Sequence, residues 1–259
     1  MTPVVSTKAT DAAVVSLTLA PDLERFSRRQ SLYAFAGLFA ALSLRDARAL
    51  VLASVLSFAA LLLGRRGAFT SSGRFGAANA VTLLRLVLVL ALAVVFHGGA
   101  GEVWAGVLVA VLSLDALDGY LARRSGDASA FGSHFDMESD ALIVLLAGLE
   151  LVLRERVGPW VLVGGALRYL YVIVLWCLPS DLGEHPRSSF GRWAFFGSFV
   201  GLTVPFVLEG PLGTAFAVVG TLMVSASFGI SFMHWAEGRR RFTARRAHAA
   251  VAEPRDPPR

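Results

Sequence analysis

The sequence predicts an all-α fold: a polytopic bundle of membrane helices with six core transmembrane helices and an extra N-terminal hydrophobic hairpin. First, 55% of the 259 residues are hydrophobic and only 17% are charged, whereas soluble globular chains carry about 25% charged residues. Second, the hydrophobic residues form continuous blocks rather than amphipathic patterns, and the mean hydropathy is +0.62. Third, arginine is concentrated in the short polar segments between the blocks. These observations exclude a disordered chain, and the single cysteine excludes a disulfide framework or a Cys-based metal site.

Six blocks approach the roughly 20 residues that a helix needs to cross about 30 Å of hydrocarbon. In chain order, these predicted spans are Ala77–His97, Val103–Ala122, Ser133–Leu153, Pro159–Leu178, Gly191–Leu208 and Leu212–His234. The polar segments between them alternate between arginine-rich and arginine-poor, which indicates that the arginine-rich segments and the C-terminus face the cytoplasm. Arg154 and Arg156 interrupt one arginine-poor segment and weaken this pattern without reversing it. All five tryptophans lie near predicted span ends, which favours an interfacial aromatic belt.

Two shorter apolar runs precede the core. Ser31–Leu44 has 14 residues and Ala49–Leu63 has 15, so each is short for a span. We expect a tight hairpin that returns to the same side of the membrane; two interfacial helices are the alternative. The predicted organisation is a disordered or cytoplasmic tail over 1–30, two short hydrophobic helices over 31–64, the six-helix core over 77–235 and a basic cytoplasmic tail over 236–259.

Four aspartates lie in two neighbouring spans, Asp115 and Asp118 in one and Asp136 and Asp140 in the next. An aspartate at the centre of a spanning helix costs about 2.5–3.5 kcal/mol, so four of them require compensating charge. Their spacings, i,i+3 and i,i+4, put each pair on one helix face, and the short joining loop makes the two helices antiparallel neighbours. Oxygen ligands of this kind favour Mg²⁺, Mn²⁺ or Ca²⁺ over zinc. His134 is offset from these faces, and we expect it to be a satisfied loop histidine.

Small residues accompany the acids. Gly119 and Ala122 follow the first pair on much the same side of the helix, and Gly132 stands one turn before Asp136. Such positions let a flat ligand or a phosphate approach the backbone; close helix packing is the alternative interpretation.

Eight residues in this stretch stand at fixed spacing: Asp115, Asp118, Gly119, Ala122, Arg123, Gly132, Asp136 and Asp140. With no gap, this pattern resembles the complete signature of the CDP-alcohol phosphotransferases, and the surrounding six-span layout is also similar to the family core. The resemblance implies an enzyme that exchanges the phosphoanhydride of a CDP-linked donor for a phosphodiester and releases CMP. For most bacterial members the donor is CDP-diacylglycerol and the acceptor is a small alcohol or alcohol phosphate.

The resemblance also assigns roles to the acids. Asp115, Asp118, Asp136 and Asp140 would ligate two divalent cations, Mg²⁺ or Mn²⁺, which stabilise the attacking and leaving oxygens of an in-line displacement. Asp140 would in addition be the base that deprotonates the acceptor hydroxyl.

Donor recognition falls, by the same resemblance, to seven residues: Gly119, Ala122, Arg123 and Gly132 of the signature and, upstream, Asn79, Thr82 and Arg85. Arg123 would bind the phosphates of the donor, which suit a guanidinium fork. Arg85 lies about 9 Å inside the bilayer region, so it is a functional candidate; neutralising one of the aspartates is its alternative role.

Acceptor recognition rests on two further arginines. Arg168 lies in the middle of the fourth core span and Arg192 opens the fifth. In phosphate-accepting family members, arginines in these regions form a pocket for the acceptor phosphate; a cytoplasmic anchor is the alternative for Arg192. The lysine-containing segment common in phosphatidylglycerophosphate synthases is absent, since the only lysine is Lys8, and this weakens the case for glycerol 3-phosphate.

We therefore expect an integral protein of a bacterial inner membrane, a homodimer surrounded by lipid, with its active site towards the cytoplasm. The net charge of +5 could suggest a nucleic-acid partner, but we expect none, because most of the arginines occupy short polar segments between the apolar blocks, as in cytoplasmic membrane loops. Transfer from a CDP-choline or CDP-ethanolamine donor to a lipid alcohol is one alternative. Membrane prenyltransferases and an intramembrane cation transporter are others, but an arginine beside a cation pathway opposes the transporter and no repeated half is visible.

Overall fold

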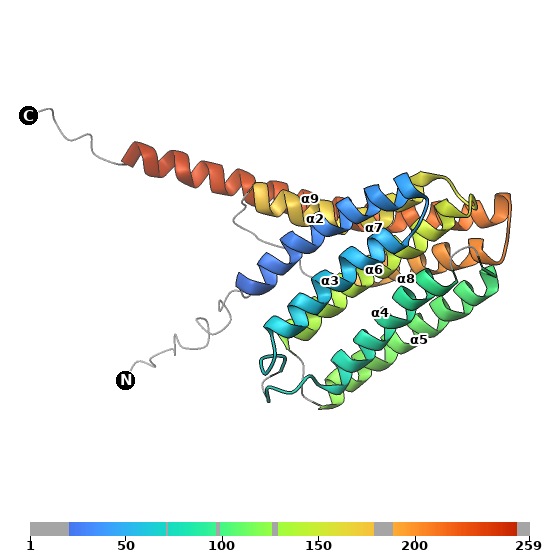
Figure 1. Cartoon of the computed structure of the whole chain (residues 1–259). Helices are drawn as coiled ribbons and strands as arrows, with labels where there is room; N and C mark the ends of the chain where they lie inside the picture. Colours follow the sequence, from blue (N-terminus) through green and yellow to red (C-terminus); the bar gives the residue numbers. More distant parts are fainter. Residues whose placement is uncertain (1–20, 71, 97–98, 126–128, 179–188, 253–259) are drawn as a thin grey trace, which may run out of the picture.

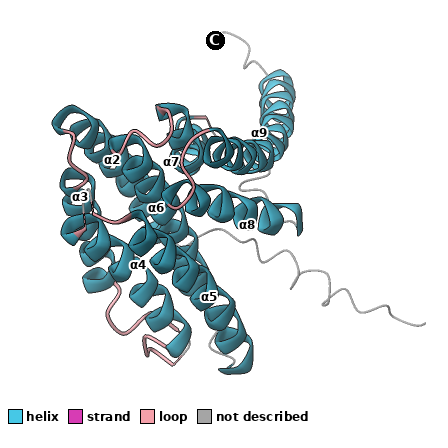
Figure 2. Cartoon of the chain, turned by 90° about the vertical axis from the view of Figure 1, so that its right-hand side faces the viewer, coloured by secondary structure: helices cyan, strands magenta, loops and turns pink. Residues whose placement is uncertain are grey.

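The computed structural model describes residues 21–70, 72–96, 99–125, 129–178 and 189–252 (Figure 1). Within helices, it describes only the backbone of residues 116, 118–125, 189 and 246–252. The described part of the chain is built from helices without any strand (Figure 2), which confirms the predicted all-helical class.

The described residues form eight α-helices: α2 (Pro21–Leu44), α3 (Arg48–Gly64), α4 (Ala77–Val95), α5 (Gly101–Ser125), α6 (Ala130–Leu153), α7 (Leu162–Cys177), α8 (Ser189–Thr203) and α9 (Pro211–Ala252). Short 3-10 turns, η1 (Pro159–Val161) and η2 (Val204–Phe206), precede α7 and follow α8. Among the residues that the structure describes, three segments are long and apolar enough to cross a membrane: α4, η1 with α7, and α9 up to Arg245. The other three core helices differ from these segments. Helices α5 and α6 carry the four aspartates, and α8 is short, with 15 residues.

Two helices extend beyond their predicted ends. α2 already includes Pro21, ten residues before the predicted Ser31, and the acidic Asp22 and Glu24 stand in its first described turn. α9 continues to Ala252, so much of the predicted basic tail is helical. An i,i+4 ion pair between Glu237 and Arg241 supports this continuation. The part of the predicted N-terminal tail before Pro21 lies outside the described residues.

Helices α2 and α3 form an antiparallel hairpin that packs on α6, α7 and α4 (Figures 1 and 2). Gly37 allows the two backbones to meet, since a Cβ there would lie 2.9 Å from the Cα of Leu50. At the turn, Arg45 forms a 2.7 Å ion pair with Glu155, beyond the far end of α6. The hairpin therefore runs the length of α6.

Aromatic rings join this hairpin to the core. Phe26 of α2 lies edge-to-face on Phe58 of α3, with 5.3 Å between ring centroids, and Phe58 lies 5.8 Å from Phe135 of α6. All three rings are buried, and such pairs contribute about 0.5–1.5 kcal/mol beyond their buried area. The hairpin is thus packed against the part of α6 that carries the aspartates.

Trp104 departs from the predicted aromatic belt. Its ring is fully buried and stacks on Phe206, with an interplanar angle of 8°. The guanidinium of Arg154 lies 5.9 Å from the Trp104 ring. Trp104 is therefore a packing residue near the end of the bundle, whereas Trp160, Trp176 and Trp193 are exposed near helix ends as a belt requires.

Candidate active site

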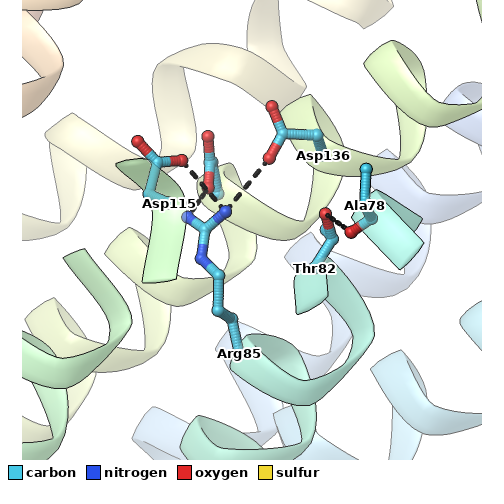
Figure 3. A network of polar contacts seen from close by, with 6 residues as sticks. Ala78, Thr82, Arg85, Asp115 and Asp136 are labelled. Atoms are coloured by element: carbon cyan, nitrogen blue, oxygen red, sulfur yellow. Dashed lines mark hydrogen bonds and ion pairs between the residues drawn. The ribbon is translucent and has the colours of Figure 1, made fainter. Parts of the chain in front are cut away.

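Three of the four predicted aspartates meet between α5 and α6 (Figure 3). One carboxylate oxygen each from Asp115, Asp136 and Asp140 lies within 4.8 Å of the other two. Asp115 comes from α5, and the other two come from successive turns of α6. Their side chains are 32%, 21% and 14% exposed, in that order, so a ligand can reach the oxygens. For these three residues, the acidic faces converge as the spacing predicts.

Arg85 of α4 points into this acidic cluster (Figure 3). Its Nη1 lies 2.9 Å from Oδ1 of Asp115 and 3.2 Å from Oδ1 of Asp136. Its Nη2 lies 2.6 Å from Oδ1 of Asp140. The arginine is fully buried, so its charge is stabilised by the acids rather than by water. Three ionised carboxylates and one guanidinium leave a formal charge of −2, which attracts further cations.

The rest of the predicted α4 element is buried beside Arg85. Thr82 donates its hydroxyl to the carbonyl of Ala78, at 3.2 Å (Figure 3). Asn79 is 5% exposed and donates its side-chain amide to the carbonyl of Phe75. These local hydrogen bonds fix the side chains against the helix, so α4 presents a rigid polar face to α6.

Gly132 lies directly against Asn79. A Cβ at Gly132 would come 2.6 Å from the Asn79 Oδ1, which is closer than van der Waals contact. At the start of α6, the hydroxyl of Ser129 accepts the backbone N–H of Gly132 at 3.0 Å and caps the helix. Two residues predicted to bind the donor are therefore in contact with each other where α4 packs on α6.

Four signature residues lie on the last turns of α5, where only the backbone is described: Asp118, Gly119, Ala122 and Arg123. The helix continues through them to Ser125. The roles predicted for their side chains fall outside the described residues and stay predictions.

Arg168 of α7 lies on a different side of α6 from the acidic cluster. Its Nη2 donates to Oε1 of Glu138 at 2.8 Å, and both side chains are buried. Glu138 is two residues from both Asp136 and Asp140, which at 100° per residue turns it to the opposite face of the helix. The hydroxyl of Ser27, from α2, donates to the same Oε1 at 2.6 Å. The arginine predicted to bind the acceptor thus holds a buried carboxylate of its own chain.

His134 belongs to the same polar network, and the loop position predicted for it is wrong. It lies within α6, is buried, and shares a 2.8 Å hydrogen bond with the hydroxyl of Ser27. Its Nε2 is 3.8 Å from Oε1 of Glu138, one turn along. The residue faces away from the aspartates, as its offset predicts.

Glu138 and Ser27 are polar residues that sequence reasoning missed. Glu138 occupies a variable position of the signature, so the motif directs no attention to it. A usable signal was available, because a glutamate in a spanning helix carries the same cost as an aspartate and stands four residues after His134. Ser27 falls in the segment predicted as a tail.

Arg192 is exposed near the start of α8. This position is compatible with both of its predicted roles, binding of the acceptor phosphate and a cytoplasmic anchor.

The acidic cluster fits hard divalent cations. Its donors are carboxylate oxygens, with neither histidine nor cysteine in the group that the described residues form. Ligands of one Mg²⁺ lie within about 4 Å of each other, so small side-chain rotations would seat all three oxygens on an ion. The partial exposure of the carboxylates leaves an open side for a phosphate.

The model of the family described as CDP-alcohol phosphatidyltransferase matches residues 75–232, which include α4 to α8 and the first half of α9. The chain is 33% identical over 166 residues to a probable phosphatidylglycerophosphate synthase of Mycobacterium tuberculosis strain CDC 1551 / Oshkosh, covering 60% of this chain and 79% of the relative. The same figures hold for the protein of that name in strain ATCC 25618 / H37Rv. No solved structure matches the chain. With the acidic cluster inside the matched region, the chain belongs to the CDP-alcohol phosphatidyltransferase family.

Proposed function

We propose that the chain transfers the phosphatidyl group of CDP-diacylglycerol to the hydroxyl of a small alcohol phosphate and releases CMP. Membership in the family makes it a transferase of phospholipid synthesis, with a CDP-linked lipid as donor and an alcohol as acceptor. The observation that carries the finer proposal is the convergence of Asp115, Asp136 and Asp140 on the buried Arg85 at an accessible position.

Two divalent cations, held by these three aspartates and Asp118, would supply the positive charge that stabilises the attacking and leaving oxygens. Arg85 contacts a carboxylate from each acidic helix, so it holds α5 and α6 at a fixed separation. Arg123 is the guanidinium group that we assign to the donor's phosphates. The buried Arg85, which pairs with the three aspartates, fits its alternative role of neutralising them. Asn79, Thr82 and the small residues Gly119, Ala122 and Gly132 would border the cytidine.

The transfer step requires one base. The acceptor oxygen forms a bond to the phosphorus that carries the diacylglycerol, and the phosphoanhydride bond to CMP breaks, with its electron pair leaving on CMP. A carboxylate oxygen of Asp140 takes the proton of the acceptor hydroxyl and passes it to water. Asp140 is 14% exposed, so an acceptor hydroxyl can reach it.

Glycerol 3-phosphate is the first acceptor to test. The product in the name of the Mycobacterium tuberculosis relatives, phosphatidylglycerophosphate, forms when a phosphatidyl group is transferred to a glycerol phosphate. The proposed role of Arg168 requires its guanidinium to leave Glu138 for the acceptor phosphate and to reach past α6, because the pair lies on the face opposite the acidic cluster. Arg192 stays the second proposed acceptor residue.

We place the acidic cluster near the cytoplasmic surface of an inner membrane. The arginine-rich loops of the sequence support this orientation, and the apolar helices support a membrane location. We also propose that the core crosses the membrane six times, that the hairpin adds two crossings, and that the chain forms a homodimer.

Replacing the proposed base tests the mechanism. Asp140→Asn should lower CMP release from CDP-diacylglycerol and glycerol 3-phosphate by about 10²–10⁴-fold, because the amide accepts no proton. Donor binding, measured by retention of labelled CDP-diacylglycerol in mixed micelles, should change far less. Asp46→Asn, in the turn between α2 and α3, is the matched control and should turn over normally. Near-normal turnover by Asp140→Asn would remove Asp140 from the mechanism.

Metal removal tests the cation proposal separately. EDTA treatment followed by gel filtration should abolish CMP release, and Mg²⁺ or Mn²⁺ should restore it, since the cluster offers only oxygen ligands. Undiminished turnover in EDTA would contradict a divalent-cation mechanism while leaving the family assignment intact.

A further inference from the structure

A groove lies between α2 and α3, outside the region that matches the family. Its volume is about 590 Å³, within the range of small-molecule sites. Its lining runs from Asp22 to Tyr33 on α2 and from Ala49 to Arg65 on and just after α3. The family match begins at residue 75, so the groove is an addition to the catalytic core.

The wall of this groove is apolar and faces outwards. Leu52 and Leu56 of α3 line it and are each 62% exposed, and Tyr33 of α2 is 47% exposed. Phe26 and Leu61 close its floor from the buried side. An outward apolar surface of this length is suited to a hydrocarbon chain rather than to water.

The mouth of the groove is basic. Arg25 and Arg29 stand one helical turn apart on α2, and Arg65 faces them from the end of α3. The single acid in the lining, Asp22, is already ion-paired with Arg65. Neither Arg25 nor Arg29 forms an ion pair with any residue that the structure describes. Three arginines and one aspartate give the mouth a formal charge of +2.

The basic mouth and the apolar wall of the groove match the two parts of an anionic phospholipid, its charged headgroup and its acyl chains. The arginines of the mouth stand near the start of α2 and at the end of α3. Figure 1 shows these two helix ends at the same end of the bundle as the start of α4. In the proposed orientation this is the cytoplasmic end, where lipid headgroups meet the protein. Basic pockets between helices on that side of a membrane recognise anionic headgroups.

We propose that the groove binds one anionic phospholipid of the surrounding bilayer, with its phosphate between Arg25 and Arg29 and an acyl chain along Leu52 and Leu56. Two guanidinium groups one turn apart suit a phosphate oxygen pair. The occupant is a bilayer lipid rather than the CDP-linked donor, because the lining includes no residue of α4, α5 or α6, which carry the acidic cluster.

Native mass spectrometry of the purified full chain in detergent micelles tests this site. The probes are phosphatidylglycerol and phosphatidylcholine with identical acyl chains. The unmodified chain should retain one phosphatidylglycerol about tenfold more strongly than phosphatidylcholine. The double variant Arg25→Gln/Arg29→Gln should lose this preference. Ala60→Phe, which fills the groove from α3, should weaken the binding of both lipids.

The matched control is Arg45→Gln/Arg48→Gln, which removes two arginines from the other end of the same hairpin and should leave the preference unchanged. All variants alter exposed positions, and a monodisperse elution profile shows that each folds. Equal retention of the two lipids by the unmodified chain would overturn the proposal. A preference for phosphatidylglycerol that survives Arg25→Gln/Arg29→Gln would also overturn it. A dimer mass that Ala60→Phe abolishes would do the same, because the occupant of the groove would then be a second copy of the chain.

Discussion

The contact between Gly132 and Asn79 illustrates how a single residue controls the site. Asn79 is held by its hydrogen bond to Phe75, so it has little freedom to yield to a larger neighbour. The absent side chain of Gly132 lets α6 approach α4, and that approach brings Asp136 towards Arg85. A packing contact thereby sets the geometry of the acidic cluster.

Gly132→Ala should weaken donor use. The added methyl group would stand 2.6 Å from the Asn79 Oδ1, and overpacking of this kind costs about 1–3 kcal/mol. We expect a higher KM for CDP-diacylglycerol and a lower melting temperature. Gly106→Ala, on α5, is the control, because a Cβ there meets nothing within 4 Å. If both variants behaved alike, the Asn79 contact would have no part in donor recognition.

Individual residues differ in how far the sequence predicts them. The two acid pairs are predictable because helical spacing alone sets which residues share a face, and Asp115, Asp136 and Asp140 do converge. Arg85 pairing with all three is less predictable, since it depends on how α4 packs against α5 and α6. The partner of Arg168 is unpredictable from its own span, because it comes from another helix.

At the scale of the element, α6 is a helix with two polar faces. Asp136 and Asp140 face Arg85, and Glu138 faces Arg168 and Ser27. Each face is paired with an arginine of a different helix, so α6 is fixed between α4 on one side and α7 with α2 on the other. The sequence predicts the helix and its first polar face, but the second depends on α2 starting at Pro21, which apolar-run length does not indicate.

The Glu138–Arg168 pair gives a test that separates stability from acceptor binding. Glu138→Ala leaves a buried guanidinium without this carboxylate and should lower the free energy of unfolding by about 3–5 kcal/mol. The double variant Glu138→Leu/Arg168→Met should recover most of that loss, as measured by thermal melting in detergent. If Arg168 binds the acceptor, the recovered double variant should still show a raised KM for glycerol 3-phosphate. A normal KM would make Arg168 structural.

At the scale of the whole molecule, contacts between loops explain an irregularity in the charge pattern. Arg154 donates to the carbonyls of Phe96 and Gly99 and to Glu150, so it caps the end of α4. Arg156 pairs with Glu209. Both arginines are therefore paired with acidic side chains, and they oppose the predicted orientation only if they are counted as unpaired positive charges. Which loops meet at one end follows from packing, so sequence composition alone does not reveal it.

The native cysteine tests the orientation. Cys177 is exposed at the end of α7 and precedes a loop predicted to be cytoplasmic. A membrane-impermeant maleimide should therefore label it in inverted vesicles but leave it unlabelled in intact cells, with detergent-solubilised protein as the full-labelling reference. The matched control is Glu209→Cys in a Cys177→Ser background. Glu209 is exposed beside Arg156 at the other end, so the control should label in intact cells. Labelling of Cys177 in intact cells would show that the orientation is the reverse of the one proposed. The acidic cluster would then lie on the side of the membrane away from a cytoplasmic donor.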